Sequence, residues 1–278
     1  MDLTWAQNLI YGMISGFTEI LPVSAQAHRL VLRKIFGTHH IPEITMLLIH
    51  IGILIAVFSC CQNHLLKIHR AKALARIPKK RRKRPLDIVS LMDSSLMMTM
   101  LVPVILGFLL FHGAQKHENN IFLVSGLLFI NGIILNIPQY LPGCNKDART
   151  LNRLEGITVG IGCSLCALPG ISCMGMALSF GQAVGEDRKY SLNMALLLEL
   201  WVLVILVILD MVAMSQAGLA GLGIRVLMQS LLSGGGACLT TYLAIRLMRK
   251  LTEGPGFVGF SYYCWALALF SLILTLFA

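Results

Sequence analysis

The stretch GFTEILPVSAQAHR, residues 16–29, places a glutamate, a proline and a histidine inside a long apolar segment. A helix that crosses lipid gains nothing from Glu19, because burying a charge in hydrocarbon is costly. Pro22 removes a backbone hydrogen bond and breaks or kinks a helix. We therefore predict that residues 4–36 form two half-helices separated near Leu21–Pro22. Broken backbone is tolerated at membrane depth only where protein or a water-filled cavity surrounds it, so the break indicates a polar site.

The composition around this stretch is that of a membrane protein. The 278 residues are 56% hydrophobic and 13% charged, whereas soluble domains average about 45–50% apolar and about 25% charged residues. Six further runs are long enough to cross a bilayer core, which takes about 20 apolar residues. These runs are Ile44–Gln62, Ile88–Phe111, Ile121–Pro138, Leu192–Met214, Val226–Met248 and Val258–Phe277. We predict an all-α integral membrane fold, a single polytopic domain over residues 1–278, with six spanning helices plus two re-entrant helical hairpins.

The second predicted hairpin covers the apolar residues 154–185, which LPGISCMG interrupts at residues 168–175. Both interruptions contain Leu-Pro with a serine two or three residues after the proline, and three predicted spans follow each one. We therefore predict an inverted repeat with halves at about residues 1–138 and 150–278. Paired broken segments of this kind indicate a binding site at the interface of the repeats.

Basic residues are concentrated in one connection. Ten of the 23 Lys and Arg residues lie in KIHRAKALARIPKKRRKR, residues 67–84. The positive-inside rule places this loop, predicted at residues 63–87, in the cytoplasm and both termini outside it, which divides the basic residues 18 to 5. A site for anionic lipid headgroups is the alternative interpretation. Nucleic acid binding is not expected, because no aromatic residues interleave with the charges.

Two motifs carry a family resemblance. GFTEILPVSAQAH resembles the first signature of the undecaprenyl-diphosphate phosphatase (bacitracin-resistance) family, usually E-G-x-T-E-F-L-P-V-S-S-T-G-H, and PGISCMGMA, residues 169–177, resembles the second, usually P-G-x-S-R-S-G-x-T. The resemblance covers nearly the whole chain. It implies a multi-pass protein of the bacterial inner membrane whose two signatures converge on a polyprenyl diphosphate. The implied activity is removal of the terminal phosphate of this lipid carrier at the outer face.

Several positions depart from the family signatures. Glu19, Ser24, His28 and Ser172 keep the usual residue. Ser15 stands in place of a glutamate, Ala25 of a serine, Cys173 of an arginine, Met174 of a serine and Ala177 of a threonine. Cysteine cannot act as a bidentate cation on phosphate. Arg29 and Arg33, beside His28, are candidate substitutes for this arginine, although snorkelling to lipid headgroups explains them as well.

Phosphoryl transfer depends mostly on positioning and charge stabilisation, which assigns candidate roles. His28 is a candidate general acid or base. Glu19 could orient His28 or hold a divalent cation such as Mg²⁺ or Ca²⁺. Ser24 could donate to a phosphate oxygen, or attack if His28 activates it. The catalytic candidates are therefore Glu19, Ser24 and His28, with Glu19 also the candidate metal ligand.

Substrate binding is assigned to cations and to the tips of the predicted hairpins. The candidates are Arg29, Arg33, Ser172 and Gly170. Backbone amides at the start of a half-helix could cradle a phosphate. Ser172 could instead only cap its helix, and Gly170 could serve only the backbone turn.

The sequence leaves two functions open. The first is a polyprenyl-diphosphate phosphatase, which the retained motif residues favour and which we expect. The second is a catalytically impaired homologue that binds or translocates polyprenyl phosphate, which the lost arginine favours. A purely structural subunit explains the basic loop but not the retained motif. The expected partners are polyprenyl phosphate or diphosphate and the membrane, and homo-oligomerisation is left open.

Two further features of the sequence have competing interpretations. Glu199, inside LLLELWVLV, indicates an ion path or a charged partner such as His50 or Arg225, or it lies near a helix end and reaches water. Cys163 and Cys166 have the spacing of half of a redox or zinc site. No second half-site follows, so we interpret them as small packing residues.

Overall fold

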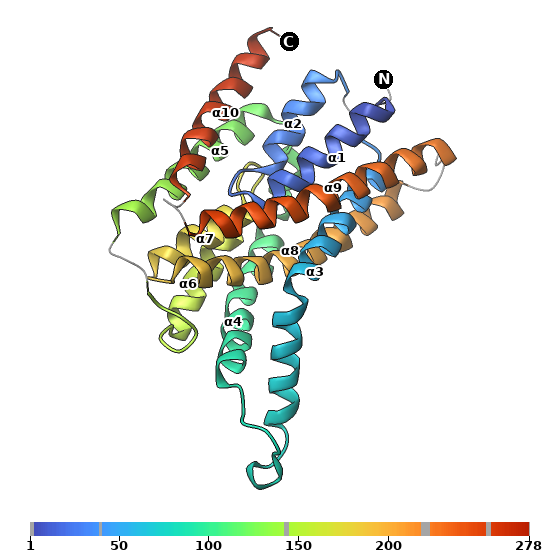
Figure 1. Cartoon of the computed structure of the whole chain (residues 1–278). Helices are drawn as coiled ribbons and strands as arrows, with labels where there is room; N and C mark the ends of the chain where they lie inside the picture. Colours follow the sequence, from blue (N-terminus) through green and yellow to red (C-terminus); the bar gives the residue numbers. More distant parts are fainter. Residues whose placement is uncertain (1–2, 39–40, 142–144, 218–222, 254–256, 278) are drawn as a thin grey trace.

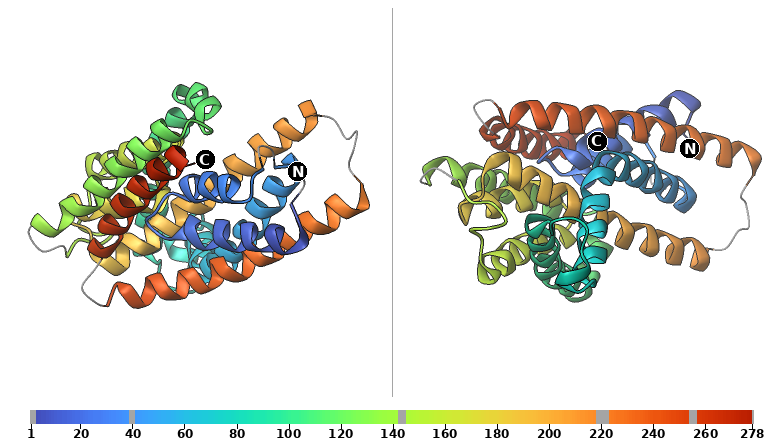
Figure 2. Two further views of the ribbon diagram at one scale, coloured as in Figure 1. Left: turned by 90° about the horizontal axis from the view of Figure 1, so that it is seen from above. Right: turned by 60° about the horizontal axis from the view of Figure 1, so that its bottom comes forward.

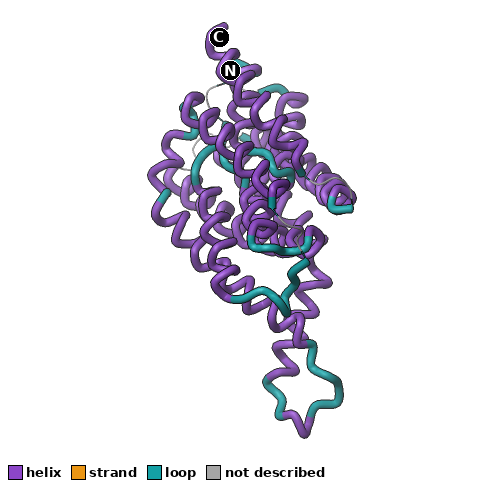
Figure 3. The backbone as a smooth tube through the Cα atoms, turned by 90° about the vertical axis from the view of Figure 1, so that its left-hand side faces the viewer, coloured by secondary structure: helices purple, strands orange, loops and turns teal. Residues whose placement is uncertain are grey.

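The computed structural model describes residues 3–38, 41–141, 145–217, 223–253 and 257–277, which are helical and contain no β-strand (Figures 1 and 3). The helices are α1 (Trp5–Ile20), α2 (Ala25–Ile35), α3 (Glu43–Ala75), α4 (Ile88–Leu110), α5 (Ile121–Asn136), α6 (Arg153–Ser164), α7 (Cys173–Ala183), α8 (Arg188–Ala217), α9 (Ile224–Leu251) and α10 (Val258–Phe277). Short 3₁₀ turns are η1 (Lys79–Arg81), η2 (His112–His117), η3 (Ile137–Tyr140) and η4 (Leu165–Ala167).

Six helices in the described chain are long and apolar enough to cross a bilayer: α3, α4, α5 with η3, α8, α9 and α10. They correspond to the six runs predicted from the sequence. Large apolar side chains such as Leu109, Leu110 and Phe122 are at least 70% exposed, as expected for surfaces that face lipid. The prediction of an all-α membrane protein with six spanning helices is confirmed.

The first predicted break lies between α1 and α2. Leu21 is extended, with φ −75° and ψ 151°, so α1 ends at Ile20. The Ser24 hydroxyl accepts a hydrogen bond from the Ala27 amide and caps the start of α2. Residues 4–36 are therefore two helices rather than one continuous span, as Pro22 predicts.

The second break lies between α6 and α7. The last turn of α6 tightens into η4, and Gly170 then adopts φ 103°, which favours glycine. A Cβ at Gly170 would also lie 2.5 Å from the Val124 carbonyl oxygen of α5. Ser172 accepts a hydrogen bond from the Gly175 amide and so caps α7.

The tips of the two breaks meet inside the bundle. The Ser172 hydroxyl donates to the Leu21 carbonyl at 3.2 Å. Asn131 of α5 joins both tips, because it accepts from the Ser172 amide at 3.0 Å and donates to the Pro22 carbonyl at 3.4 Å. The two broken segments therefore contact each other, as the pairing of their breaks indicates. The return of each hairpin to one membrane face, the inverted repeat and its halves stay predictions.

Helix α9 packs along α1 and α3 through small residues (Figure 2). A Cβ at Gly12 of α1 would lie 2.2 Å from the Ser233 carbonyl oxygen, and one at Gly16 would lie 2.3 Å from that of Ala237. The Thr241 hydroxyl of α9 donates to the Gly16 carbonyl at 2.9 Å. In lipid, close backbone approach and hydrogen bonds of this kind hold helices together. This contact holds α1, and with it Glu19, in place.

Substitution of Gly16 by leucine is expected to loosen this contact. Overpacking costs about 1–3 kcal/mol or more, so the thermal midpoint of the purified protein in detergent should fall by about 5 °C or more. The matched control is Gly126→Leu in α5, where an added Cβ meets no atom within 4 Å. Equal midpoints for the two variants would contradict the close α1–α9 contact.

The basic connection between α3 and α4 is shorter than predicted. Helix α3 continues to Ala75, so residues 63–75 of the predicted loop 63–87 are helical and the connection covers residues 76–87. Residues such as Leu, Lys and Ala in this part favour helix and allow α3 to extend beyond the bilayer core. The connection projects away from the rest of the molecule (Figure 3), and the start of α1 and the end of α10 lie at the opposite end (Figure 1).

The burial of Glu186, which lies between α7 and α8 and outside the spanning helices, should make the stability of the fold depend on pH. Glu186 is 1% exposed, and burial raises the pKa of its carboxyl from 4.5 to about 7, opposed by the nearby Ser191 hydroxyl and assisted by the charge of Glu155. Because the folded state holds this proton more tightly, the stabilisation is fully present below about pH 4.5 and is lost as the pH rises through about 7.

We therefore expect Glu186→Gln to gain stability relative to the wild type between pH 5 and pH 8, by a free energy of unfolding on the order of 3 kcal/mol. Thermal midpoints of both proteins across this pH range measure the gain. If the thermal midpoints of the two proteins changed with pH in parallel, Glu186 would not be a buried carboxyl that titrates in this range.

Candidate functional site

A cavity of about 640 Å³ borders the place where the two breaks meet. Side chains from α1, α2, α3, α7 and α8 line it, together with part of the α4–α5 connection. Its ionisable lining groups are Tyr11, Glu19, Arg29, Arg33, Glu43, His50, Lys116, Glu118, Cys166, Cys173 and Asp210. The structure thus brings together four of the residues predicted from the sequence, namely Glu19, Arg29, Arg33 and Ser172.

Arg29 and Glu19 form a buried ion pair on the cavity wall. Nη1 of Arg29 lies 3.2 Å from Oε2 of Glu19, and their side chains are 8% and 12% exposed. Glu118 and Asp210 are the other carboxylates whose charge acts on Arg29. A buried ion pair costs desolvation energy that its attraction only partly offsets. Such a pair beside a cavity is therefore suited to bind an anion, which would share the guanidinium with Glu19.

Arg33 lies one turn beyond Arg29 on α2 and is more exposed. Its Nη1 is 3.9 Å from Oε1 of Glu118, a carboxylate that is 45% exposed. Lys116 lines the same cavity. Three cations therefore border the cavity, and they are the groups with which it could hold phosphate.

Ser24 and His28 do not line the cavity. The Ser24 hydroxyl accepts from the Ala27 amide as the helix cap. Successive helical residues point about 100° apart, so Arg29 faces the cavity whereas His28 faces α10. There Nε2 of His28 lies 2.7 Å from the Tyr263 hydroxyl and the rings stack, while Nδ1 lies 2.7 Å from the Ser24 carbonyl oxygen. In this structure Ser24 and His28 therefore lie outside the cavity that Glu19 lines, and their catalytic roles stay predictions.

The helices α2 and α7 begin at the cavity, because their first residues Ala25 and Cys173 line it. Helix N-termini carry partial positive charge and attract anions. Ser172 also lines the cavity as the cap of α7. Gly170 does not; its amide donates to Oε1 of Gln26 at 3.2 Å, so in this structure it acts on the backbone turn.

A second acid–base pair lines the cavity, and the sequence analysis did not identify it. Nδ1 of His50 on α3 lies 2.6 Å from Oδ2 of Asp210 on α8. Nε2 of His50 is buried and has no hydrogen-bond partner within the described chain. A carboxylate that orients a histidine in this way is a common arrangement for proton transfer. The signal was present, because Asp210 is a carboxylate inside the apolar run LVILDMV.

Glu199 lies deep in the bundle on α8 and is 0% exposed. The interpretation that it reaches water near a helix end is therefore wrong. His50 pairs with Asp210 rather than with Glu199. The Glu199 carboxylate instead interacts with Cys173, the residue that follows Ser172.

Comparison with known proteins places the chain in a family. Residues 8–270 match the model of the bacitracin resistance protein BacA family. Proteins named undecaprenyl-diphosphatase are similar to it: that of Carboxydothermus hydrogenoformans is 30% identical over 274 residues, 96% of each chain, and that of Nocardioides sp. is 28% identical over 192 residues, 69% of each. Another, from Methanobrevibacter smithii, is 25% identical over 264 residues, 93% of each chain. This membrane protein with two broken helical segments therefore belongs to the bacitracin resistance protein BacA family.

Proposed function

We propose that this chain removes the terminal phosphate of a polyprenyl diphosphate, with undecaprenyl diphosphate as the substrate that the names of its relatives indicate. The observation that carries the proposal is the buried Arg29 in a cavity bordered by two helix N-termini and two further cations. A diphosphate carries its charge on closely spaced oxygens, which these groups match. The apolar exterior of the bundle lets the lipid chain remain in the membrane.

The reaction is a hydrolysis. A water oxygen bonds to the terminal phosphorus, and the bond from that phosphorus to the bridging oxygen breaks. The products are inorganic phosphate and polyprenyl phosphate, and one water proton must be accepted by the protein or by phosphate. Arg29, with the N-termini of α2 and α7, stabilises the charge that develops on the phosphoryl oxygens.

Proton transfer has two sets of candidates. Glu19 lines the cavity and His50 lines it with its ring oriented by Asp210, which supports both as proposed acceptors of the proton from water. The catalytic roles of Ser24 and His28 stay predictions from the sequence. Catalytic contacts often form only when substrate binds, so their distance from the cavity does not exclude them.

A divalent cation such as Mg²⁺ or Ca²⁺ would bind between the Glu19 carboxylate and the diphosphate of the substrate. Hard cations bind oxygen, and Mg²⁺ often combines one or two carboxylates with substrate phosphates. Glu19 offers a carboxylate, although one of its oxygens contacts Arg29, and Ser15 stands in place of the family's other glutamate. We propose that Glu19 supplies one ligand and the diphosphate supplies others. Such a cation would add positive charge on the phosphoryl oxygens.

The alternative of an impaired homologue that only binds or translocates polyprenyl phosphate is not favoured by the family or by the names of the relatives. It also assigns no function to the oriented His50–Asp210 pair. Arg33, Ser172 and Gly170 remain proposed contacts of the substrate, the first two in the cavity wall and Gly170 through the turn that positions α7.

The deciding experiment measures phosphate release from undecaprenyl diphosphate by the purified chain in lipid nanodiscs. We expect release above that of empty discs, and loss of release in Glu19→Gln. Binding of undecaprenyl phosphate without any release, with and without added Mg²⁺ or Ca²⁺, would contradict the hydrolase and support the alternative. Mass measurement of the same discs tests homo-oligomerisation, which the sequence leaves open.

We also propose that the connection 76–87 is cytoplasmic and that both termini are not. In support, the charge of this connection follows the positive-inside rule, and the ends of α1 and α10 lie opposite it. A cysteine at Lys80 should be protected from a membrane-impermeant thiol reagent in intact spheroplasts, and a cysteine at Glu118 should react. The reversed pattern, measured above the background of the native cysteines, would contradict this topology.

A further inference from the structure

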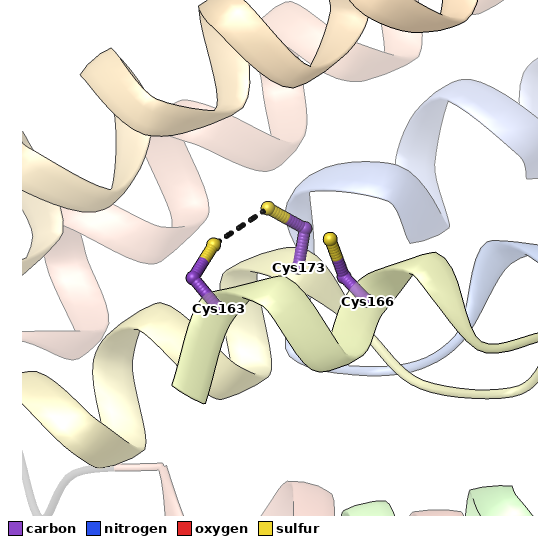
Figure 4. Close-up of side chains that lie close together, drawn as sticks. All are labelled: Cys163, Cys166 and Cys173. Carbon is purple, nitrogen blue, oxygen red and sulfur yellow. Dashed lines mark hydrogen bonds between the residues drawn. The ribbon is translucent and has the colours of Figure 1, made fainter. Parts of the chain in front are cut away.

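Three cysteines converge at the break between α6 and α7. Cys163 lies in the last turn of α6, Cys166 in η4 and Cys173 at the start of α7. Their sulfurs lie within 4.8 Å of one another, with Cys163 and Cys173 at 3.4 Å (Figure 4). All three side chains are buried, with exposures of 0%, 9% and 7%. Residues ten positions apart in sequence thus point their thiols at one place.

A buried carboxylate interacts with two of these thiols. Glu199 of α8 is 0% exposed, and within the described chain neither of its oxygens makes a hydrogen bond of normal geometry. Its carboxylate interacts with Cys163 and Cys173. A buried polar group without hydrogen bonds is costly and needs an explanation. The three thiols are the ligand groups that lie together, and the carboxylate that interacts with two of them can supply a fourth ligand.

We propose that Cys163, Cys166, Cys173 and Glu199 form a metal site for a thiophilic divalent cation, Zn²⁺ being the expected occupant. Zinc binds thiolate and carboxylate in tetrahedral sites with Zn–S distances of about 2.3 Å, which places sulfurs about 3.8 Å apart. One sulfur–sulfur distance is 3.4 Å and the others are at most 4.8 Å, so binding needs only small shifts of the sulfurs. Hard cations such as Mg²⁺ prefer oxygen ligands, and three sulfurs select against them.

Packing alone and a disulfide are the competing explanations. Packing accounts for small buried thiols but leaves the buried Glu199 carboxylate without a hydrogen bond in the described chain. A disulfide between Cys163 and Cys173 requires sulfurs about 2.05 Å apart, closer than the 3.4 Å observed, and it would leave Cys166 and Glu199 unused. A metal ion uses all four groups, and its charge offsets part of the negative charge of the thiolates and the carboxylate that bind it.

The site would fix the second break. Its three sulfur ligands come from both sides of the turn, so one ion would hold α6, η4 and α7 together and tie them to α8. Cys166 and Cys173 also line the cavity, so the ion would hold the part of the wall beside Ser172 in place. The metal site itself does not depend on whether the protein hydrolyses a diphosphate.

Metal titration of the purified chain, reduced and stripped with chelator, tests the proposal. Zn²⁺ added at micromolar concentration should bind about one ion per chain, counted by elemental analysis after gel filtration. Co²⁺ in place of Zn²⁺ should give the near-ultraviolet absorption of thiolate-to-cobalt charge transfer. Wild-type protein that retains no zinc and gives no such absorption would overturn the site.

Variants identify the ligands. Cys166→Ser should lose retained zinc and the cobalt–thiolate absorption, whereas Cys61→Ser, which removes a buried thiol of α3 outside the cluster, should keep both. Glu199→Gln keeps the sulfurs and should bind Co²⁺ at least about tenfold more weakly. Equal zinc retention by Cys166→Ser and Cys61→Ser would overturn the cysteine site, and unchanged affinity in Glu199→Gln would remove the carboxylate from it. If a variant fails to fold, the Co²⁺ titration of the wild type still tests the proposed site.

Discussion

Arg29→Met is expected to reduce phosphate release about 1,000-fold or more. Arg29 is the most buried cation of the cavity and is held by Glu19 at 3.2 Å. A positioned arginine on the transferred phosphoryl group is worth about three or more powers of ten in rate. Methionine preserves much of the length of the side chain and removes only the charged group. The measurement is single-turnover phosphate release in nanodiscs at saturating undecaprenyl diphosphate.

Two further variants separate catalysis from folding. Arg29→Met leaves Glu19 buried without its cation, which destabilises the fold, so Glu19→Gln/Arg29→Met should recover the thermal midpoint without recovering release. Arg246→Met is the matched control, because Arg246 stacks on Tyr242 at an exposed site away from the cavity, and it should release phosphate at the wild-type rate. A folded Arg29→Met protein with release within tenfold of wild type would show that another cation binds the phosphate.

His50→Ala is expected to reduce phosphate release by a factor on the order of 10²–10⁴, the range for the loss of a general acid or base. Asp210→Asn should have a smaller effect in the same direction, because it removes the group that orients the ring at 2.6 Å. Since the pair acts as a unit, the double variant should be no slower than His50→Ala. The same single-turnover assay measures all three proteins.

The same helix provides the control. His64 of α3 also pairs with an aspartate, Asp93 of α4, with Nε2 and Oδ2 3.1 Å apart, but it lines a separate cavity of about 440 Å³. His64→Ala should leave release unchanged. A small effect of His50→Ala combined with a large effect of His28→Ala would assign proton transfer to His28, as the sequence predicts, and would require its ring to leave Tyr263 when substrate binds.

The sequence determined the features that depend on local chemistry. Hydropathy and charge located six spans, because the bilayer imposes a length and an apolarity that each segment must satisfy by itself. The two breaks could be located from Pro22, Pro169 and Gly170. Proline interrupts a helix, and glycine permits the positive φ of a turn, which a continuous helix excludes. Glu19 and Arg29 could be selected as site residues, since a charged group in an apolar run is costly wherever it lies.

Local chemistry did not determine which way a side chain faces. Consecutive residues of α2 send His28 toward α10 and Arg29 into the cavity, and the signature motif, which ends at His28, does not tell which way either side chain faces. The end of α3 was also misplaced, because a helix can continue into water wherever its residues favour helix. The contact between the two tips was expected from the repeat alone, whereas Asn131, which joins them, lies in a span with no motif.

Only the tertiary structure decided the pairings between distant helices. His50 meets Asp210 across 160 positions, and Glu199 meets the cysteines of the second break because α8 packs against α7. Each of these groups can be recognised alone as a polar residue in an apolar helix. Its partner depends on which helices are neighbours and on how each is rotated about its axis. Those two quantities are set by the packing of the whole bundle, and no short stretch of sequence contains them.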